Sequence, residues 1–122
     1  MEKIKVAIIG LGYVGLPLAH LFATKYPVVG FDVKQSRVDA LRKGEDITRE
    51  MSAEKLNSVL LSHLPEFDET GLYFTSEPSD LQSCNYYIVA VPTPVDTHHS
   101  PDLTPLYKAS ETVGHALSKG DI

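Results

Sequence analysis

Two hydrophobic periodicities alternate along the chain, one typical of strands and one typical of helices. The run Ile4–Ile9 is mostly apolar and rich in β-branched residues, which favours a strand. The next segment has helical spacing, with apolar residues at i, i+4, i+7 and i+8 that are Val14, Leu18, Leu21 and Phe22. Pro17 falls just beyond the first turn of this helix, where a local distortion is expected. Val28–Asp32 returns to strand character, so the pattern predicts a strand, helix and strand unit.

The rest of the chain continues this alternation. Asn85–Val91 is nearly all apolar, which is typical of a strand buried on both faces of a parallel sheet. The other expected elements are a strand at Leu72–Thr75, helices at Lys34–Lys43, Ala53–Leu64 and Thr104–Ser118, a helical turn at Ser79–Leu81 and a polar loop at Glu45–Ser52. This order predicts an α/β fold of the Rossmann type, a doubly wound parallel sheet, in one domain covering residues 1–122.

A glycine-rich turn joins the first strand to the first helix. Gly10, Gly12 and Gly15 have the spacing of the dinucleotide-binding fingerprint, between the strand and the helix that this fingerprint requires. Gly10 permits a sharp turn, Gly12 has no Cβ to keep a diphosphate from the main chain, and Gly15 lets the helix lie close to the sheet. The free amides and positive dipole end of the helix attract the phosphates. Glycines at this spacing also arise by chance in loops, so a tight turn without a ligand is the alternative.

An acidic residue closes the second strand at the distance that the fingerprint demands. Asp32 lies 20 positions past Gly12, where a carboxylate accepts hydrogen bonds from the adenosine ribose hydroxyls. A carboxylate there repels a 2′-phosphate, so the sequence predicts NAD rather than NADP. Arg37 has two readings: it can accommodate that phosphate, or it can stack on or border the adenine.

The turn after the strand at Asn85–Val91 is the second candidate part of a cofactor site. In a doubly wound sheet this strand lies beside the first one, and the ligand sits over the carboxyl ends of both. Thr93, between Pro92 and Pro94, is therefore expected near the nicotinamide ribose. The alternative is that the two prolines only end the strand.

Charge and composition exclude several classes of function. The chain carries a formal net charge of −5; residues 1–61 hold 9 basic and 7 acidic side chains, and residues 62–122 hold 2 and 9. Neither half has a basic stripe, so nucleic-acid binding is not expected. The segment before His20 superficially resembles a signal peptide, but its three glycines and Pro17 are better explained by the fingerprint. A single Cys84 suits a reducing compartment, so we expect a cytoplasmic protein without a membrane span.

No other cluster of residues predicts catalysis or metal binding. His98 and His99 are adjacent and point apart, with no third ligand at suitable spacing, so a solvated loop is favoured over a metal site. Cys84 has no basic residue near it in sequence and is interpreted as a small buried apolar residue rather than a nucleophile. We therefore assign no catalytic and no metal-binding residue.

These motifs together resemble the N-terminal part of the UDP-glucose/GDP-mannose dehydrogenase family, over essentially all 122 residues. The motifs that carry the resemblance are Gly10–Pro17, Gly30–Asp32, Val91–Pro94 and Asp102–Leu106 running into Ala109–Gly114. Within the family the chain looks most like the branch that acts on UDP-N-acetylhexosamines for surface polysaccharides, including the Vi-antigen type. Asp46–Glu50 replaces the Glu-Pro-Gly-Leu turn that is usual in UDP-glucose dehydrogenases.

The resemblance implies a two-step oxidation of a sugar 6-hydroxymethyl group to a carboxylate with reduction of two NAD. In such enzymes the second step passes through a thioester on a cysteine of a later domain, and the whole protein is a homo-oligomer. The residues that carry over bind the cofactor: Gly10, Gly12, Tyr13, Val14, Gly15, Asp32, Arg37 and Thr93.

The sequence also suggests that the chain is a fragment. Lys119–Ile122 looks like the entrance to another strand, and the substrate-binding domains of the family have no counterpart here. We therefore expect a chain that binds NAD and oxidises nothing by itself. The alternatives are a UDP-glucose 6-dehydrogenase, another NAD-dependent dehydrogenase of the 3-hydroxyacyl or 6-phosphogluconate type, and a non-catalytic NAD-sensing module.

Overall fold

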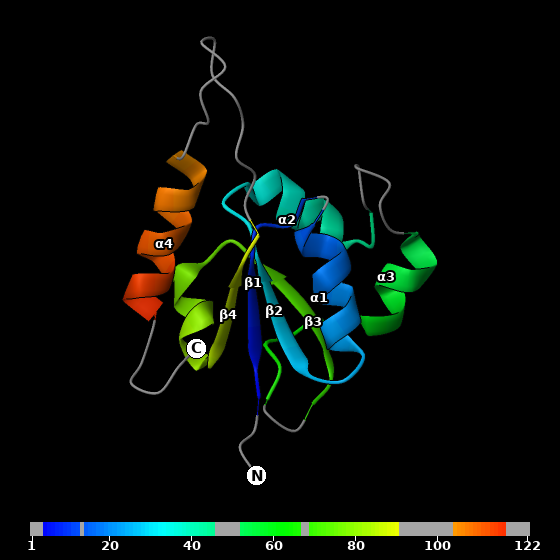
Figure 1. The fold of residues 1–122 in the computed structure, drawn as a ribbon. Coiled ribbons are helices and arrows are strands. Elements are labelled where there is room, and N and C mark those ends of the chain that lie inside the picture. The colour runs from blue at the N-terminus through cyan, green and yellow to red at the C-terminus, as the bar shows by residue number, and fades with distance from the viewer. Residues whose placement is uncertain (1–3, 13, 46–51, 67–68, 91–103, 117–122) are drawn as a thin grey trace.

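A computed structural model describes residues 4–12, 14–45, 52–66, 69–90 and 104–116 of the chain (Figure 1). Within these ranges strands and helices alternate, as the sequence pattern predicts. In chain order the elements are β1 Val6–Ile9, α1 Gly15–Ala23, β2 Pro27–Phe31, α2 Gln35–Arg42, α3 Ala53–Val59, β3 Gly71–Thr75, the 3₁₀ helix η1 Pro78–Ser83, β4 Tyr86–Val89 and α4 Thr104–Ala116. None of the helices in these ranges combines the length and apolar character that a membrane span requires.

The four strands form one parallel sheet in the order β3-β2-β1-β4. From β1 the chain runs outward through β2 to β3, and the connection from β3 then crosses back to place β4 on the other side of β1. This reversal of strand order defines a doubly wound sheet. Because all pairings are parallel, the carboxyl ends of the strands lie along one edge. This arrangement confirms the predicted Rossmann-type fold.

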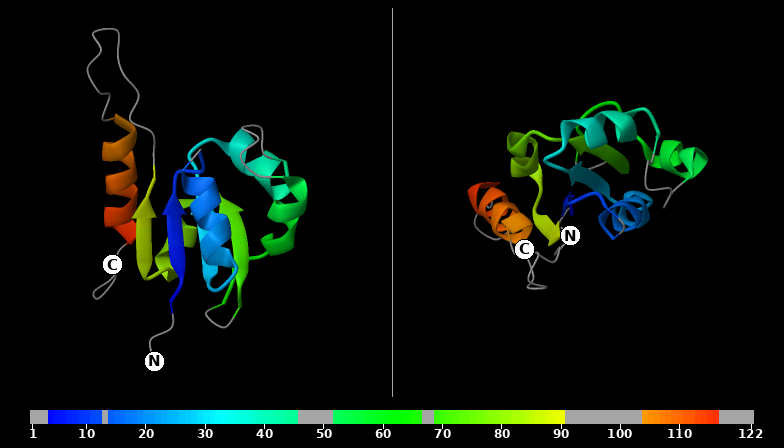
Figure 2. Two further views of the ribbon diagram at one scale, coloured as in Figure 1. Left: turned by 45° about the vertical axis from the view of Figure 1, so that its right-hand side comes forward. Right: turned by 90° about the horizontal axis from the view of Figure 1, so that it is seen from above.

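Helices cover both faces of the sheet, and each face has its own core. Alternate residues of β1 point to opposite faces, and all four are buried. One core contains Val6 and Ile8 of β1 with buried residues of α1, α2 and α3, and the other contains Ala7 and Ile9 with residues of η1 and α4. Figure 2 shows α4 and α1 on opposite sides of the sheet. A strand that feeds two cores must be apolar at every position, which explains the unbroken apolar run in the sequence.

The buried face of α1 differs from the predicted one. The residues that bury are Gly15, Leu16, Ala19 and Ala23, whereas Val14 and Leu21 are each 63% exposed. Small side chains at i, i+4 and i+8 let the helix axis approach the sheet closely, and this turns the bulkier Val14 and Leu21 outward. Pro17 is the third residue of α1, and the helix continues past it as predicted. The residues on either side make helical bonds, from the Leu16 N–H to the Gly12 carbonyl at 3.2 Å and from the Leu18 N–H to the Val14 carbonyl at 3.3 Å, and proline has no N–H to add to this series.

Two other predicted elements need correction. The helix expected at Ala53–Leu64 ends at Val59, because Leu60 becomes extended and forms a β-bridge with Leu72, and the Leu61 N–H donates to the Leu72 carbonyl at 2.8 Å. The strand expected to be buried on both faces, β4, is instead half-buried, with Val89 39% exposed. It lies at the edge of the described sheet, where only β1 pairs with it among the described residues.

Candidate functional site

The glycine-rich turn leaves β1 at the carboxyl edge of the sheet, between the ends of β2 and β4. The Gly10 N–H donates to the Phe31 carbonyl at 2.8 Å, and the Ala90 N–H donates to the Ile9 carbonyl at 2.8 Å. Gly10 has a φ of 101°, a conformation that side-chain-bearing residues rarely adopt. The turn is therefore attached to both neighbouring strands at its start, and glycine at this position makes the sharp change of direction available.

Gly15 and Gly12 meet opposite surroundings. A Cβ added at Gly15 would lie 1.7 Å from the Gly10 carbonyl oxygen and 2.8 Å from its carbon, so α1 packs directly on the turn. A Cβ added at Gly12 would have no protein atom of the described residues within 4 Å. Gly15 is thus required by the fold, whereas none of the described residues fills the position next to Gly12, as expected for a glycine that a diphosphate approaches.

Asp32 follows β2 directly and is held against the turn. Its Oδ2 accepts from the Leu11 N–H at 3.1 Å, its Oδ1 accepts from the Lys34 N–H at 3.0 Å, and its own N–H donates to the Thr75 carbonyl at 3.1 Å. A carboxylate has about four acceptor positions, so these two bonds fix its orientation and leave capacity for further donors. The residue is half-buried. This geometry suits a carboxylate that grips two ribose hydroxyls.

Arg37, on the first turn of α2, reaches back to the same turn. Its Nε and Nη2 both donate to the Leu11 carbonyl oxygen, at 3.0 and 2.6 Å. The structure therefore brings Asp32 and Arg37 together on one residue of the turn, Leu11, where sequence reasoning expected both to face the cofactor. Leu11 itself is 1% exposed.

Val33 is a candidate that sequence reasoning missed. It lies between Asp32 and Lys34 and is 72% exposed, an unusual position for a large apolar side chain. An exposed apolar side chain beside the Asp32 carboxylate offers a surface on which an aromatic ring can lie. The signal in the sequence is an apolar residue directly after the acidic residue of the fingerprint.

Three of the predicted site residues lie at or beyond the limits of the described chain. Tyr13 and Thr93 lie outside the described residues. Val14 is the N-cap residue of α1, and its 63% exposure leaves it accessible beside the turn. Ala90, which directly follows β4 and is the last residue described before residue 104, is half-buried at the same edge of the sheet as the turn.

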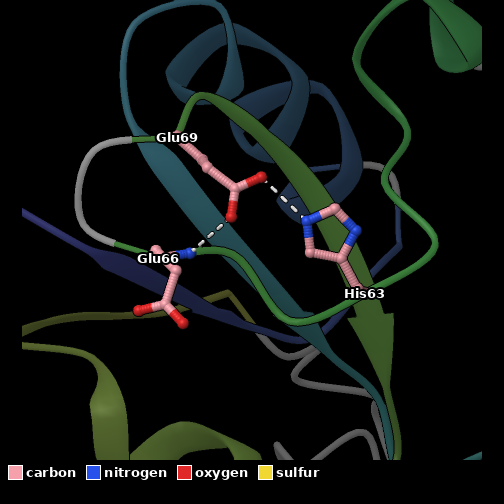
Figure 3. Close-up of polar contacts among 3 residues, drawn as sticks. All are labelled: His63, Glu66 and Glu69. Carbon is pink, nitrogen blue, oxygen red and sulfur yellow. Dashed lines mark hydrogen bonds and ion pairs between the residues drawn. The ribbon is translucent and has the colours of Figure 1, made fainter.

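A separate polar cluster lies at the opposite edge of the sheet. Glu69, two residues before β3 begins, accepts the Glu66 N–H at 3.0 Å and pairs with His63 Nε2 at 2.8 Å (Figure 3). The bond from the Glu66 N–H, and next the bond with His63, lower the pKa of the Glu69 carboxyl below its usual value. The cluster lies near the amino end of β3, at the other end of the strands from the glycine turn. Its bonds tie together the segment between α3 and β3, and we assign it to no cofactor site.

The lowered pKa of Glu69 predicts a small acid sensitivity. The folded state binds the Glu69 proton less tightly than the unfolded state does, so the contribution to stability is complete above the ordinary pKa of 4.5 and is lost as the pH falls through the lowered value. We expect the difference in melting temperature between the chain and Glu69→Gln to shrink between about pH 6 and about pH 3. The effect is small because the pair is exposed. A difference that grew on acidification would contradict this.

The remaining candidates from the sequence form no site among the described residues. Cys84 is 2% exposed and lies in the core that contains η1 and α4, as predicted for a small buried residue. Across the described ranges no three histidine, cysteine, aspartate or glutamate side chains gather as metal ligands would. His98 and His99 lie outside these ranges.

The fold and the turn define a dinucleotide-binding domain, and comparison with known proteins specifies its family. Residues 4–122 match the UDP-glucose/GDP-mannose dehydrogenase family, NAD binding domain, and the chain belongs to this family. NAD is accordingly its cofactor, and its assignment to an unrelated dehydrogenase of the 3-hydroxyacyl or 6-phosphogluconate type is not favoured.

Named relatives agree with this family. The chain is 52% identical to a UDP-N-acetyl-D-glucosamine 6-dehydrogenase of Pseudomonas aeruginosa and 48% identical to one of Salmonella typhi, over 122 residues in both. These matches cover 100% of the chain and 26% of each relative, so the chain spans about a quarter of their length. The solved structure of a UDP-D-ManNAc dehydrogenase from Pyrococcus horikoshii superposes with a TM-score of 0.76 at 29% identity, over 98% of the chain and 27% of that structure.

Proposed function

We propose that the chain is the NAD-binding part of a UDP-N-acetylhexosamine 6-dehydrogenase. The longer protein of which the chain would be a part, here called the parent, would oxidise the 6-hydroxymethyl group of UDP-N-acetylglucosamine or UDP-N-acetylgalactosamine to a carboxylate while two NAD are reduced. The similarity to two relatives named UDP-N-acetyl-D-glucosamine 6-dehydrogenase supports this substrate class. The homo-oligomeric state and the cytoplasmic location that we infer for the parent remain part of this proposal.

The observation that carries the proposal is the position of Asp32. Its carboxylate is fixed by backbone N–H groups beside a glycine turn in which no described residue approaches the Cβ position of Gly12, and α1 begins next to this turn. A fixed carboxylate 20 positions after that glycine is the arrangement that binds an adenosine ribose. The position next to Gly12, which the described residues leave open, fits the diphosphate that would join this ribose to the nicotinamide half.

The cofactor-binding residues divide by the part of NAD that they would meet. Gly10, Gly12, Tyr13, Val14 and Gly15 form or support the diphosphate site, Asp32 binds the adenosine ribose, Val33 lies under the adenine, Arg37 borders this end from α2, and Thr93 lies near the nicotinamide ribose. When bound, NAD supplies the hydride acceptor for the oxidation. The residues of this chain contribute binding and orientation, and we assign the nucleophilic cysteine to the part of the parent that follows Ile122.

Selectivity for NAD over NADP is the first test of this assignment. Asp32 would face the added 2′-phosphate with like charge, so we expect NADP to bind the chain at least about tenfold more weakly than NAD. Isothermal titration calorimetry with both cofactors measures this ratio. Equal affinities would contradict the role given to Asp32.

A turnover assay tests whether oxidation of the sugar requires domains that this chain lacks. We expect the chain alone to form no NADH from UDP-N-acetylglucosamine and NAD, and the parent protein to form two NADH for each sugar oxidised. NADH production by the chain alone would overturn the assignment of catalysis to later domains, and an inactive parent with bound NAD would favour a sensing module.

A further inference from the structure

Leu11 is held by Asp32, directly after β2, by Arg37 on α2 and by the strand beneath it. Its N–H donates to Asp32 Oδ2 at 3.1 Å, and its carbonyl accepts from Arg37 Nε and Nη2 at 3.0 and 2.6 Å. Its side chain lies over β2, where Cδ2 would come within 3.0 Å of a Cβ on Gly30. Hydrogen bonds therefore hold both the N–H and the carbonyl group of Leu11, which lies between Gly10 and Gly12.

Fixing the Leu11 carbonyl also fixes the peptide that continues into the turn. The described chain has no cis peptide bonds, and in a trans peptide the carbonyl and the next N–H point in opposite directions. Because the Leu11 oxygen points toward Arg37 on α2, the Gly12 N–H points away from α2. Two donors from a guanidinium to one carbonyl oxygen form a charge-assisted contact that is stronger than a neutral hydrogen bond.

We propose that Arg37 is a positioning residue, which sets the diphosphate-binding turn through the Leu11 carbonyl and has its main effect there rather than on the adenosine half of the cofactor. The proposal rests on the proposed function for its ligand, but its structural part concerns only the contact between Arg37 and Leu11. It gives α2 an indirect role in binding phosphates, through the contact of Arg37 with the turn before α1.

Arg42 provides a matched control on the same helix. It lies five residues after Arg37, and its Nε donates to the Phe74 carbonyl at 2.9 Å while its guanidinium lies 5.3 Å from the centre of the Tyr73 ring. Arg42→Ala therefore removes the same charge and a similar bond to a main-chain carbonyl, but from β3 rather than from the turn. Comparing Arg37→Ala with Arg42→Ala separates the loss of the contact with the turn from the loss of a positive charge or of a bond between α2 and the sheet.

The binding experiment uses ligands that contain different parts of NAD. With Arg37→Ala we expect the dissociation constants of NAD and ADP to rise together by about tenfold and that of adenosine to change by less than about twofold. Arg42→Ala should leave all three within about twofold. An adenosine constant that rises as much as that of NAD would overturn the proposal, because it would show direct contact with the adenosine half.

The second measurement needs no cofactor. Hydrogen exchange of the Leu11 amide, which donates to Asp32, should be at least about tenfold faster in Arg37→Ala than in the unsubstituted chain and in Arg42→Ala, as followed by NMR in the cofactor-free chain. Arg37→Lys, which keeps one donor and the charge, should restore part of the protection. Unchanged exchange at the Leu11 amide in Arg37→Ala would overturn the proposal, since an effect of charge alone would leave the turn intact.

These two measurements distinguish failure of the inference from failure of the proposed function. If the unsubstituted chain takes up no NAD, the proposed function is overturned, and the exchange rates still decide whether Arg37 holds the turn. If the chain binds NAD and Arg37→Ala binds it equally well, the positioning role is overturned and the proposed function stands.

Discussion

Gly15→Ala is expected to destabilise the fold by at least about 3 kcal/mol. The added Cβ would lie 1.7 Å from the Gly10 carbonyl oxygen and 3.5 Å from the Ala90 Cβ. A methyl group has no rotamer that could avoid a main-chain atom, so α1 or the turn must move away from β1. We expect a lower urea midpoint in chemical unfolding and, because the turn is displaced, loss of NAD uptake by the fraction that remains folded.

Gly12→Ala is the matched control for this prediction. Its Cβ would meet no described protein atom within 4 Å, so the urea midpoint should stay close to that of the unsubstituted chain. The same methyl group would occupy the space assigned to the diphosphate, and NAD affinity should fall by at least about tenfold. An unchanged midpoint for Gly15→Ala, or unchanged NAD affinity for Gly12→Ala, would contradict the roles given to these two glycines.

Asp32→Ala is expected to weaken NAD binding by about a hundredfold. The substitution removes the acceptor of the proposed ribose bonds, which are charge-assisted. It also leaves the Leu11 and Lys34 N–H groups without the carboxylate that they bond to, so stability should fall by about 1 kcal/mol. Calorimetric titration with NAD and thermal unfolding of the free chain measure the two effects separately.

Two further variants make the Asp32 result specific. Asp32→Asn should not restore binding, because both oxygens of Asp32 accept from N–H groups and an amide nitrogen in either place would face another donor. Asp39→Ala removes an equal charge from α2, where its carboxylate accepts from Gln35 Nε2, and should change NAD affinity by less than about twofold. Equal losses for Asp39→Ala and Asp32→Ala would attribute the effect to net charge instead.

The outcome for α1 shows where pattern reasoning fails. The apolar spacing singled out a stripe that includes Val14 and Leu21, yet both are 63% exposed, and the buried face is made of Gly15, Leu16, Ala19 and Ala23. Both stripes have helical spacing, so periodicity cannot choose between them. The choice depends on how closely the helix approaches the sheet, and small residues decide that only once the sheet is present.

The sequence by itself determined the parallel α/β fold, the glycine turn, the position of Asp32 and the family, because these depend on local spacing and on residue types with few alternatives. Only the tertiary structure decided that Arg37 binds the Leu11 carbonyl, that Val33 is exposed beside Asp32 and that β4 is half-buried. These features join residues 26 positions apart in the chain or depend on which strand has a neighbour. Contacts of this kind follow from the packing of whole elements, which no local pattern encodes.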